Sequence, residues 1–267
     1  MTFRLAYHAI TWGPEPNVAG MLSEIRQAGY EGLELFQDEE ALGPAKRLKS
    51  MLAEVGLIPV ALTGVAHIIG PEAANAVQAT KERIDYAAAL GARYYVVVPP
   101  FLQREQVEAD HIREFAANLD LLSNYARPHN LEPTVHHHMK TLIETADDCA
   151  RLIELSPESL LTFDSAHCAV AGDDCAHMLR RFSRYIDYVH LKDYNAPLPA
   201  GSDWDSADFA ELGRGTGAID FAAILQELGA IGYEGWLTVE LDGKAAKRPP
   251  YQSAQISREY LRQLVNY

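Results

Sequence analysis

The sequence predicts an α/β fold, a single-domain (β/α)8 TIM barrel over residues 1–267, and three observations support this prediction. Short apolar runs alternate with longer stretches of helical period along the whole chain, a pattern typical of βα units. No stretch rich in Pro, Gly or Ser interrupts this alternation. Eight consecutive βα units in about 250 residues match the size of a (β/α)8 barrel. An open doubly wound sheet is the alternative, and the absence of Gly-x-Gly-x-x-Gly from the first βα turn argues against it.

The first four units are defined by apolar runs and by the residues that stop them. Residues 5–10 form the first expected strand, and a turn rich in Gly and Pro follows it. The first helix ends at Gly29, because glycine commonly terminates a helix. Residues 93–98 (RYYVVV) form a strand that two prolines stop. The other expected strands are 32–36 and 57–62, and the other expected helices are 42–55 and 72–90.

The last four units repeat the rhythm. Thr145 is a favourable N-cap residue for a helix over 145–155. The run 186–193 has the length and the Ile, Tyr and Val content of a buried parallel strand. Residues 195–216 are long for a structureless connection, so we expect a functional βα loop there. The other expected strands are 131–135, 159–163 and 235–241, and the other expected helices are 110–128, 173–182, 220–228 and 252–265.

Composition and charge narrow the classes of function. The chain has 23 Lys and Arg against 37 Asp and Glu, and its net charge of -14 repels nucleic acid and anionic membranes. No apolar stretch approaches the roughly 20 residues of a membrane span, and no signal segment is recognised. The three cysteines lack Cys-x-x-Cys spacing, which disfavours a disulfide framework or a structural zinc site. We therefore expect a cytoplasmic protein without nucleic-acid or membrane partners.

Side chains able to do chemistry gather at the expected strand ends, where the active site of a (β/α)8 barrel lies. Side chains alternate along a strand, so His136 and His138 face one way and His137 faces the other. The fourth strand end offers no obvious candidate. The candidates are His8, Glu34, His67, His136, His138, Asp164, His167, His190, Lys192 and Glu240.

Asp164, His190 and Glu240 end three different strands, and with one residue of strand five they would form an open shell of nitrogen and oxygen ligands. Mn²⁺, Co²⁺, Mg²⁺ and Zn²⁺ suit such ligands, and an ion in an open site polarises substrate oxygens. Each residue also has a structural interpretation: a helix N-cap for Asp164, a core histidine for His190 and a chance charge for Glu240. Their joint occurrence at three strand ends of one barrel favours the metal site.

Other candidates are less specific. Glu34 could contact substrate or form a salt bridge with an arginine, and His67 is weaker still. Cys168 stands beside a histidine, but the partners of a catalytic nucleophile meet in space and need not adjoin in sequence. The segment 213–217 (GRGTG) precedes a helix without directly following a strand, so a flexible turn is favoured over a phosphate contact.

Several motifs that run along nearly the whole chain are those of a known family. They are 10–13 (ITWG), 29–35 (GYEGLEL), 136–141 (HHHMKT), 163–167 (FDSAH), 189–193 (VHLKD) and 232–240 (GYEGWLTVE). The sequence resembles the sugar-phosphate isomerase/epimerase superfamily with the xylose isomerase-like barrel, which also contains endonuclease IV. Within it the likeness is greatest to the inosose (2-keto-myo-inositol) dehydratases. The triple histidine and the Asp-x-x-His pattern are the more specific motifs.

The resemblance implies that Asp164, His190 and Glu240 are metal ligands, and it favours Mn²⁺ or Co²⁺ over Mg²⁺ or Zn²⁺. Many members place a glutamate on strand five as the fourth ligand, whereas this chain has His136 there. Glu144 matches a glutamate that is frequent in the dehydratase-like branch. Either His136 or Glu144 would therefore complete the shell.

The resemblance also assigns substrate-facing positions, although two departures separate this chain from the dehydratases. The chain is shorter than a typical inosose dehydratase, and Arg214 stands where relatives commonly carry an acidic residue. The substrate is therefore not carried over from the resemblance. The residues expected to carry catalysis are His138, Glu144, His167 and Lys192, and those expected to bind substrate are Trp12, Glu34 and His67.

The expected chemistry proceeds through an enediolate. A divalent ion that chelates the carbonyl and adjacent hydroxyl of an α-hydroxyketone stabilises this intermediate. His138, Glu144 or a metal-bound carboxylate would take the carbon-bound proton, and Lys192 or His167 would give a proton to an oxygen. Loss of a β-hydroxyl is then dehydration, reprotonation on the other face is epimerisation, and transfer to the neighbouring carbon is isomerisation.

The predicted function is a metal-dependent lyase of the inosose dehydratase type that acts on a keto-cyclitol or keto-sugar, and the chain is compatible with a homo-oligomer. The alternatives are a sugar (phosphate) isomerase or epimerase and a lyase that eliminates the aglycone of a 3-keto-glycoside. An endonuclease IV-like nuclease is a remote alternative, because a duplex-binding protein needs a basic face. A non-catalytic binding barrel would hold no stoichiometric metal.

Overall fold

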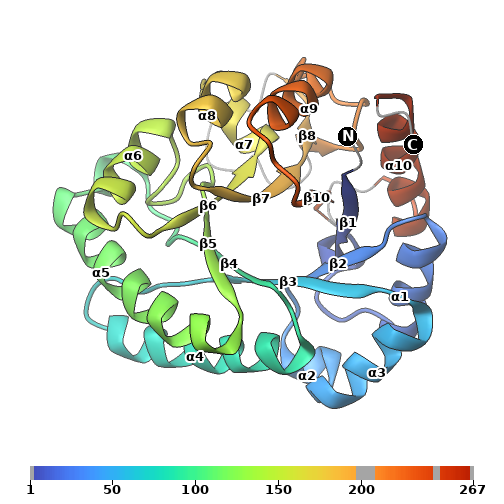
Figure 1. Cartoon of the computed structure of the whole chain (residues 1–267), viewed down its shortest axis with the longest axis horizontal. Coiled ribbons are helices and arrows are strands. Elements are labelled where there is room, and N and C mark those ends of the chain that lie inside the picture. Colours follow the sequence, from blue (N-terminus) through green and yellow to red (C-terminus); the bar gives the residue numbers. More distant parts are fainter. Residues whose placement is uncertain (1–2, 197–207, 243–246, 265–267) are drawn as a thin grey trace. The chain divides into compact units, whose positions relative to one another are not determined.

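The computed structural model of the chain describes residues 3–196, 208–242 and 247–264 (Figure 1). Its longer strands are β1 (Arg4–His8), β2 (Gly32–Leu35), β3 (Ile58–Val65), β4 (Tyr94–Val98), β5 (Glu132–His136), β6 (Leu160–Asp164), β7 (Ile186–Leu191) and β10 (Trp236–Val239). Two short strands are β8 (Asp193–Tyr194) and β9 (Phe209–Ala210). β2 and β4 are buried at every residue, as expected for parallel strands that are covered on both faces.

Helices follow the strands in the order that βα units require. The α-helices are α1 (Val18–Gln27), α2 (Glu39–Leu42), α3 (Ala45–Val55), α4 (Ala73–Leu90), α5 (Ala109–Ala126), α6 (Ala146–Leu155), α7 (Ser165–Val170), α8 (Cys175–Arg181), α9 (Phe221–Ala230) and α10 (Pro250–Leu264). Short 3-10 helices are η1 (Ala9–Trp12), η2 (Arg104–Gln106) and η3 (Arg127–His129).

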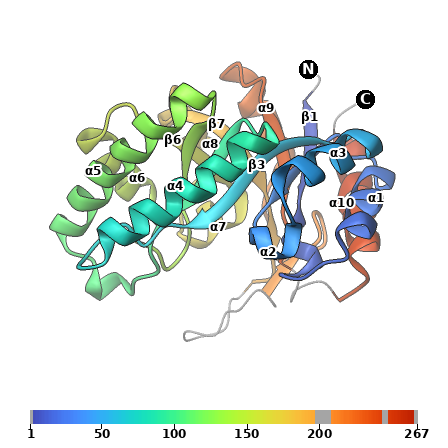
Figure 2. The ribbon, with the colours of Figure 1, turned by 90° about the horizontal axis from the view of Figure 1, so that it is seen from below.

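The chain divides into two compact units by its internal contacts. The central unit is Ala61–Tyr188, and the terminal unit combines Met1–Val60 with Val189–Tyr267. In the terminal unit β1 pairs with β2 and with β10, and β10 pairs with β7, all in parallel. α1 contacts both α3 and α10 in this unit (Figure 2).

The central unit has the same construction. β3 pairs with β4, β4 with β5, and β5 with β6, again all in parallel. α4 and α5 lie side by side along this unit, and α5 also contacts α6 (Figure 1). The carboxyl ends of β5 and β6 are therefore neighbours, and each ends in a side chain that the sequence singles out, His136 and Asp164.

The predicted fold class is confirmed. Among the described residues, the eight longer strands follow the order of a closed (β/α)8 barrel, β1-β10-β7-β6-β5-β4-β3-β2. That the chain folds as one domain over its full length stays a prediction. No helix among the described residues is long and apolar enough to cross a membrane.

Two expected boundaries are wrong, and each has a local cause. The single helix expected over 42–55 is divided into α2 and α3, because Gly43 adopts φ 78° and Pro44 begins a new helix as its N-cap. The first strand ends at His8, two residues earlier than expected. There the His8 Nδ1 accepts a hydrogen bond from the Ile10 N–H at 3.1 Å, and the chain turns into η1.

The connection expected over 195–216 contains regular structure at both ends, while residues 197–207 lie outside the described part of the chain. β8 pairs antiparallel with β9, with Asp193 opposite Ala210. The Asp193 Oδ2 accepts hydrogen bonds from the N–H groups of Gly213 at 2.9 Å and Gly215 at 3.0 Å. The glycine amides that could have bound a phosphate are therefore held by a carboxylate of the chain itself.

Asp148 is a buried carboxylate that closes the amino end of α6 and anchors the connection after β4. It accepts hydrogen bonds from the N–H and the hydroxyl of Thr145, the N-cap residue that the sequence predicts. Arg104 holds the same carboxylate with two nitrogens, at 2.7 and 2.9 Å. Burial alone would raise the pKa of Asp148, but Arg104 and Thr145 lower it below its usual range.

We expect Asp148→Ala to lower the free energy of unfolding by about 1–3 kcal/mol, because a cap and charge-assisted hydrogen bonds are lost. The folded-state pKa of Asp148 is lowered, so its ionic contribution is present above the unfolded pKa of about 3.9 and is lost as pH falls through the folded value. Urea unfolding of wild type and Asp148→Asn from pH 7 to pH 2 measures this: the difference should shrink below about pH 4. Asp147→Asn, on an exposed neighbour, is the control, and an equal effect there would contradict the assignment.

Candidate active site

The terminal unit places four acidic or imidazole side chains at adjoining strand ends. His8 ends β1 and lies in register with Glu34 on β2, while His190 lies near the end of β7. Glu240 directly follows β10. Their side chains are buried in a region where a parallel sheet exposes its carboxyl ends.

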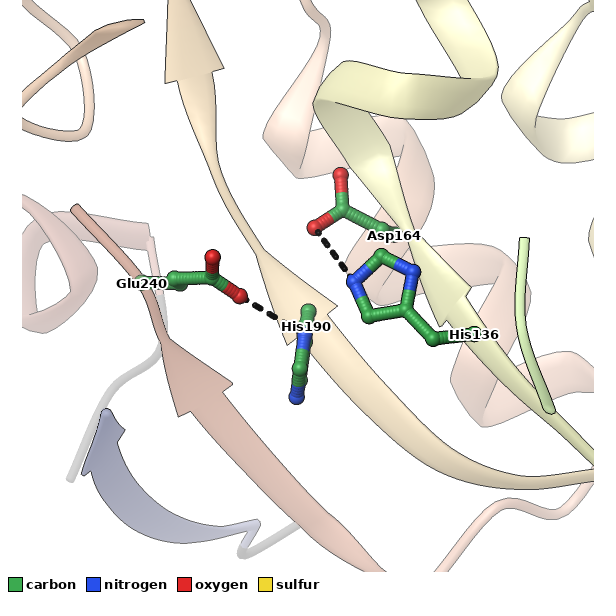
Figure 3. Close-up of side chains that lie close together, drawn as sticks. All are labelled: His136, Asp164, His190 and Glu240. Carbon is green, nitrogen blue, oxygen red and sulfur yellow. Dashed lines mark ion pairs between the residues drawn. The ribbon is translucent and has the colours of Figure 1, made fainter. Parts of the chain in front are cut away.

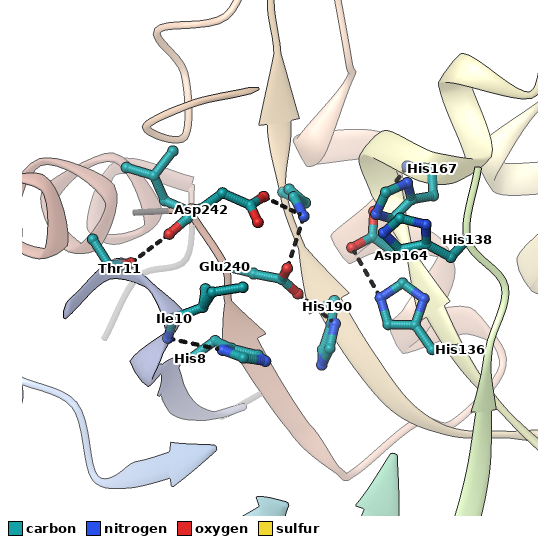
Figure 4. Close-up of polar contacts among 12 residues, drawn as sticks. His8, Ile10, Thr11, His136, His138, Asp164, His167, His190, Glu240 and Asp242 are labelled. Carbon is teal, nitrogen blue, oxygen red and sulfur yellow. Dashed lines mark hydrogen bonds and ion pairs between the residues drawn. The ribbon is translucent and has the colours of Figure 1, made fainter. Parts of the chain in front are cut away.

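His190 lies between two carboxylates, one on each ring nitrogen. Its Nε2 is 2.8 Å from Glu34 Oε2. Its Nδ1 is 2.9 Å from Glu240 Oε2 (Figures 3 and 4). Burial alone would lower the pKa of His190, but Glu34 and Glu240 raise it to about 10. Glu34 also lies 3.4 Å from His8 Nε2, so this fully buried carboxylate bridges two imidazoles.

Lys192 is the second cation of this cluster. Its Nζ donates to Glu240 Oε1 at 2.7 Å and lies 2.8 Å from Asp242 Oδ2. The ammonium also lies 4.0 Å from the centre of the Phe209 ring. Burial would raise the pKa of Glu240, but Lys192, His8 and His190 hold it well below its usual range. Glu240 is therefore an ionised carboxylate with imidazole and ammonium groups against its two oxygens.

The central unit holds the second cluster, on β5 and on the turn after β6. Asp164 ends β6 and caps α7, a helix that the sequence did not predict ahead of the expected one at 173–182. Its Oδ1 accepts from the His167 N–H at 2.9 Å, and its own N–H donates to His137 Nε2 at 3.0 Å. The N-cap interpretation of Asp164 is thus confirmed for one oxygen, and His137 fixes the backbone beside it.

The other Asp164 oxygen faces His136. The His136 Nδ1 lies 2.8 Å from the carbonyl oxygen of His137, and because a carbonyl only accepts, Nδ1 carries the proton. The Nε2 faces Asp164 Oδ2 at 3.7 Å (Figure 3). This separation is too long for a hydrogen bond. A histidine whose outer nitrogen donates to a carbonyl is the usual arrangement of a metal ligand.

The buried imidazoles and carboxylates of these two clusters have the chemistry of ligands for a divalent ion. Each unit offers one buried imidazole and one buried carboxylate, and nitrogen and oxygen ligands of these kinds suit borderline and hard divalent metals. The four residues are His136, Asp164, His190 and Glu240.

The rings of His138 and His167 lie close together in the central unit, beside His136. Their ring centroids are 3.8 Å apart, and the His136 ring lies 5.4 Å from His138 and 5.2 Å from His167 (Figure 4). The His138 Nδ1 donates to the Met139 carbonyl at 2.8 Å, which leaves Nε2 of the neutral ring as an acceptor. His138 is partly exposed and His167 is buried, so His138 is the imidazole that solvent or a small molecule reaches.

Glu144 lies in the loop after β5 and supports that loop. Its Oε1 accepts from the Lys140 N–H at 3.0 Å, and Lys140 adopts the left-handed conformation at φ 59°. The sequence left Glu144 and His136 open as the fourth ligand. One Glu144 oxygen thus binds the loop backbone, whereas His136 presents its nitrogen to Asp164.

The three residues expected to bind substrate lie in three different environments. Trp12 lies in η1 and donates from Nε1 to Glu24 at 2.7 Å, with its ring against Tyr7. His67 is exposed in the connection after β3. Glu34 has no exposed surface and contacts His190, a geometry that suits positioning of the imidazole.

Sequence reasoning missed three residues of these clusters. Asp242 follows Glu240 by two positions and could have been found from the same alternation that grouped His136 and His138. Phe101 lies at the carboxyl end of β4, where no candidate was seen, with its ring 5.4 Å from His138. The residue that holds Asp164, His137, gave no signal beyond its place in the triple histidine.

Parallel strands in barrel order, with buried imidazoles and carboxylates at their carboxyl ends, define the class of (β/α)8 barrels that carry a polar site at that face. The profile of the Xylose isomerase-like TIM barrel family matches residues 22–264. The chain belongs to this family.

Curated and solved relatives cover almost the whole chain. The inosose dehydratase of Clostridium perfringens (strain 13 / Type A) is 27% identical and covers 95% of this chain and 92% of its own length. Among solved structures, the IOLI protein with a binding zinc atom has a TM-score of 0.82 at 20% identity and covers 98% of both chains. An L-ribulose 3-epimerase has a TM-score of 0.82 at 23% identity and covers 99% of this chain and 95% of its own. At this identity the two structures support the fold.

Proposed function

We propose that this protein is a divalent-metal-dependent enzyme that forms an enediolate from a keto-cyclitol or keto-sugar and then eliminates water, as a dehydratase of the inosose type. The observation that carries the proposal is that a buried imidazole and a buried carboxylate, His136 and Asp164, face each other across 3.7 Å. Both are side chains that divalent metals bind, and the contact of His136 Nδ1 with a carbonyl oxygen leaves Nε2 turned toward the carboxylate. The similarity to inosose dehydratase over nearly the full length supports the choice of reaction.

His136, Asp164, His190 and Glu240 are the residues that we propose as the metal ligands. His136 is preferred to Glu144 as the fourth ligand, because Glu144 binds the backbone of its own loop. Glu34 would position His190 by accepting from its Nε2–H, the carboxylate-to-histidine contact that commonly orients a metal ligand. Mn²⁺ or Co²⁺ is the ion that we favour, and the zinc named for the IOLI protein keeps Zn²⁺ as an alternative beside Mg²⁺.

When bound, a divalent ion polarises the carbonyl of the substrate and stabilises the negative charge that develops on its oxygens. His138 is the base that we propose for the carbon-bound proton, because its Nε2 is an acceptor and its ring is partly exposed. The buried His167 ring lies against His138, with ring centroids 3.8 Å apart. Lys192 is the proposed acid, since its ammonium already donates hydrogen bonds to oxygens beside the site.

The alternative with specific support is epimerisation. It needs the same enediolate and a second proton donor on the opposite face, and the fold is shared with an L-ribulose 3-epimerase. A nuclease is disfavoured by the net charge of -14. We therefore propose a small-molecule enzyme that works in the cytoplasm.

Proton NMR in D₂O tests the proposal. Protein loaded with Mn²⁺, Co²⁺ or Zn²⁺ and an EDTA-treated sample are incubated with 2-keto-myo-inositol, the protein and paramagnetic metal being removed before the spectra are recorded. We expect a dehydrated product only with metal. Solvent exchange of a carbon-bound proton without a new alkene signal would replace dehydration by epimerisation. Absence of both with every metal would contradict the inosose assignment.

A further inference from the structure

Phe101 is a half-exposed aromatic residue three positions beyond the end of β4, in the central unit. Its exposed fraction is 50%, and its ring meets the His138 ring edge to face, with centroids 5.4 Å apart and planes at 83°. This strand end carries none of the acidic or imidazole groups that mark β5 and β6. Phe101 is therefore the side chain that β4 contributes beside the proposed base.

The backbone holds Phe101 firmly in this place. Phe101 forms an antiparallel bridge with Thr141 in the loop after β5. On either side of it, the Leu102 N–H donates to the Lys140 carbonyl at 3.0 Å and the Leu142 N–H donates to the Pro100 carbonyl at 2.9 Å. The loops after β4 and β5 are thus joined, and the exposed ring is fixed before any ligand arrives.

Exposure of a single apolar side chain needs no explanation in general. Leu121 is 54% exposed on α5, remote in sequence from every strand end. Phe101 differs because it contacts His138 and because the neighbouring strand end is also apolar. Val65, which ends β3 and pairs with Val98, is 45% exposed. The ends of β3 and β4 thus each carry an exposed apolar side chain, Val65 and Phe101, whereas β5 and β6 end in polar groups.

A polyhydroxylated ring matches a site that has apolar side chains on one side and polar side chains on the other. Its hydroxyl and carbonyl oxygens need polar partners, while its axial C–H groups form an apolar face that packs on an aromatic ring. A site with imidazoles and carboxylates on one side and a fixed phenyl ring on the other satisfies both parts. An acyclic phosphorylated substrate would leave the phenyl ring without a matching surface.

We propose that Phe101 is a specificity-determining residue whose exposed face packs on the C–H face of a cyclic polyol or keto-cyclitol and holds it beside His138. This inference rests on the proposed function and adds to it the shape of the substrate and the residue that recognises it. The energy expected of such a contact is about 0.5–1.5 kcal/mol, so its loss weakens ring binding about twofold to tenfold.

Saturation-transfer NMR tests the contact without turnover. The protein is perdeuterated except for its phenylalanines and saturated in the phenyl region, with myo-inositol, a non-reacting ring, and glycerol 3-phosphate, an acyclic phosphate, as probes. We expect saturation to reach the C–H protons of myo-inositol and to be lost in Phe101→Leu, with little transfer to glycerol 3-phosphate. Equal transfer in wild type and Phe101→Leu, or no binding of the ring, would overturn the proposal.

Kinetics on 2-keto-myo-inositol complete the test. Phe101→Leu should raise KM about twofold to tenfold with kcat nearly unchanged, Phe101→Trp should restore KM, and Leu121→Ala should change neither. An unchanged KM in Phe101→Leu would contradict the ring contact. Failure of the proposed function has a different signature: myo-inositol binds with transfer from Phe101, yet wild type loaded with each metal exchanges no carbon-bound proton.

Discussion

Asp164→Asn is expected to abolish stoichiometric metal binding and to reduce turnover about a thousandfold, since several kcal/mol of transition-state stabilisation depend on the metal. The substitution is nearly isosteric. Asn keeps an oxygen that can accept from the His167 N–H and so preserves the cap of α7. It replaces the other oxygen by an amide donor, which can bond to His136 Nε2 and fill the position of the cation.

Metal content by atomic emission, turnover by NMR and the melting temperature are measured together. Asp174→Asn is the matched control, because Asp174 caps α8 and accepts from the His177 N–H at 2.6 Å in the same way. The control should keep its metal and its activity. If Asp164→Asn bound metal as wild type does, the assignment of Asp164 as a ligand would be wrong.

Lys192→Met is expected to separate catalysis from metal binding. The variant should retain metal, because the ammonium is not a ligand, and should lose activity about 10²–10⁴-fold as the proposed acid is removed. It should also be less stable by about 3–5 kcal/mol, because Glu240 and Asp242 lose the cation that their buried oxygens face. Metal content, turnover and urea unfolding measure the three effects.

A double variant keeps this prediction testable if Lys192→Met folds poorly. Adding Asp242→Asn removes one of the two carboxylates and should recover part of the stability without recovering activity. Lys81→Met is the control, since the Lys81 ammonium lies over the Tyr125 ring on the helical layer, 5.1 Å from its centre. Full activity in either Lys192 variant would show that another group supplies the proton.

The fold was predictable because parallel strands buried on both faces leave an unmistakable alternation with helices. The positions of the strand ends then predicted Asp164, His190 and Glu240 with one residue of strand five as metal ligands, because strand ends of a barrel meet at one face. The predicted ends of helices and strands are wrong where a single residue changes the local backbone conformation. The helix expected over 42–55 has continuous apolar spacing, but the Gly43-Pro44 pair inside it is itself a sequence signal for the break that the structure shows.

The partners of these residues could not be predicted to the same extent. For Glu34 the sequence leaves substrate contact and a salt bridge with an arginine open, whereas in the structure the Glu34 carboxylate lies 2.8 Å from a ring nitrogen of His190. Asp164 was read as either a ligand or a cap, whereas its two oxygens face different partners. Phe101 carries no titratable or metal-binding group, so the sequence pattern does not mark it as a residue of the site. Its position depends on backbone bonds between two loops.

The carboxylate of Asp193 has a consequence for competition between ligands. It occupies the Gly213 and Gly215 amides from within the same chain, and a Cβ at Gly215 would clash with it. A tethered group acts at an effective concentration of the order of millimolar or above, which a free metabolite rarely matches. A phosphorylated sugar therefore meets an anion-binding loop that is already saturated. These two amides are therefore not available to the phosphate of a ligand.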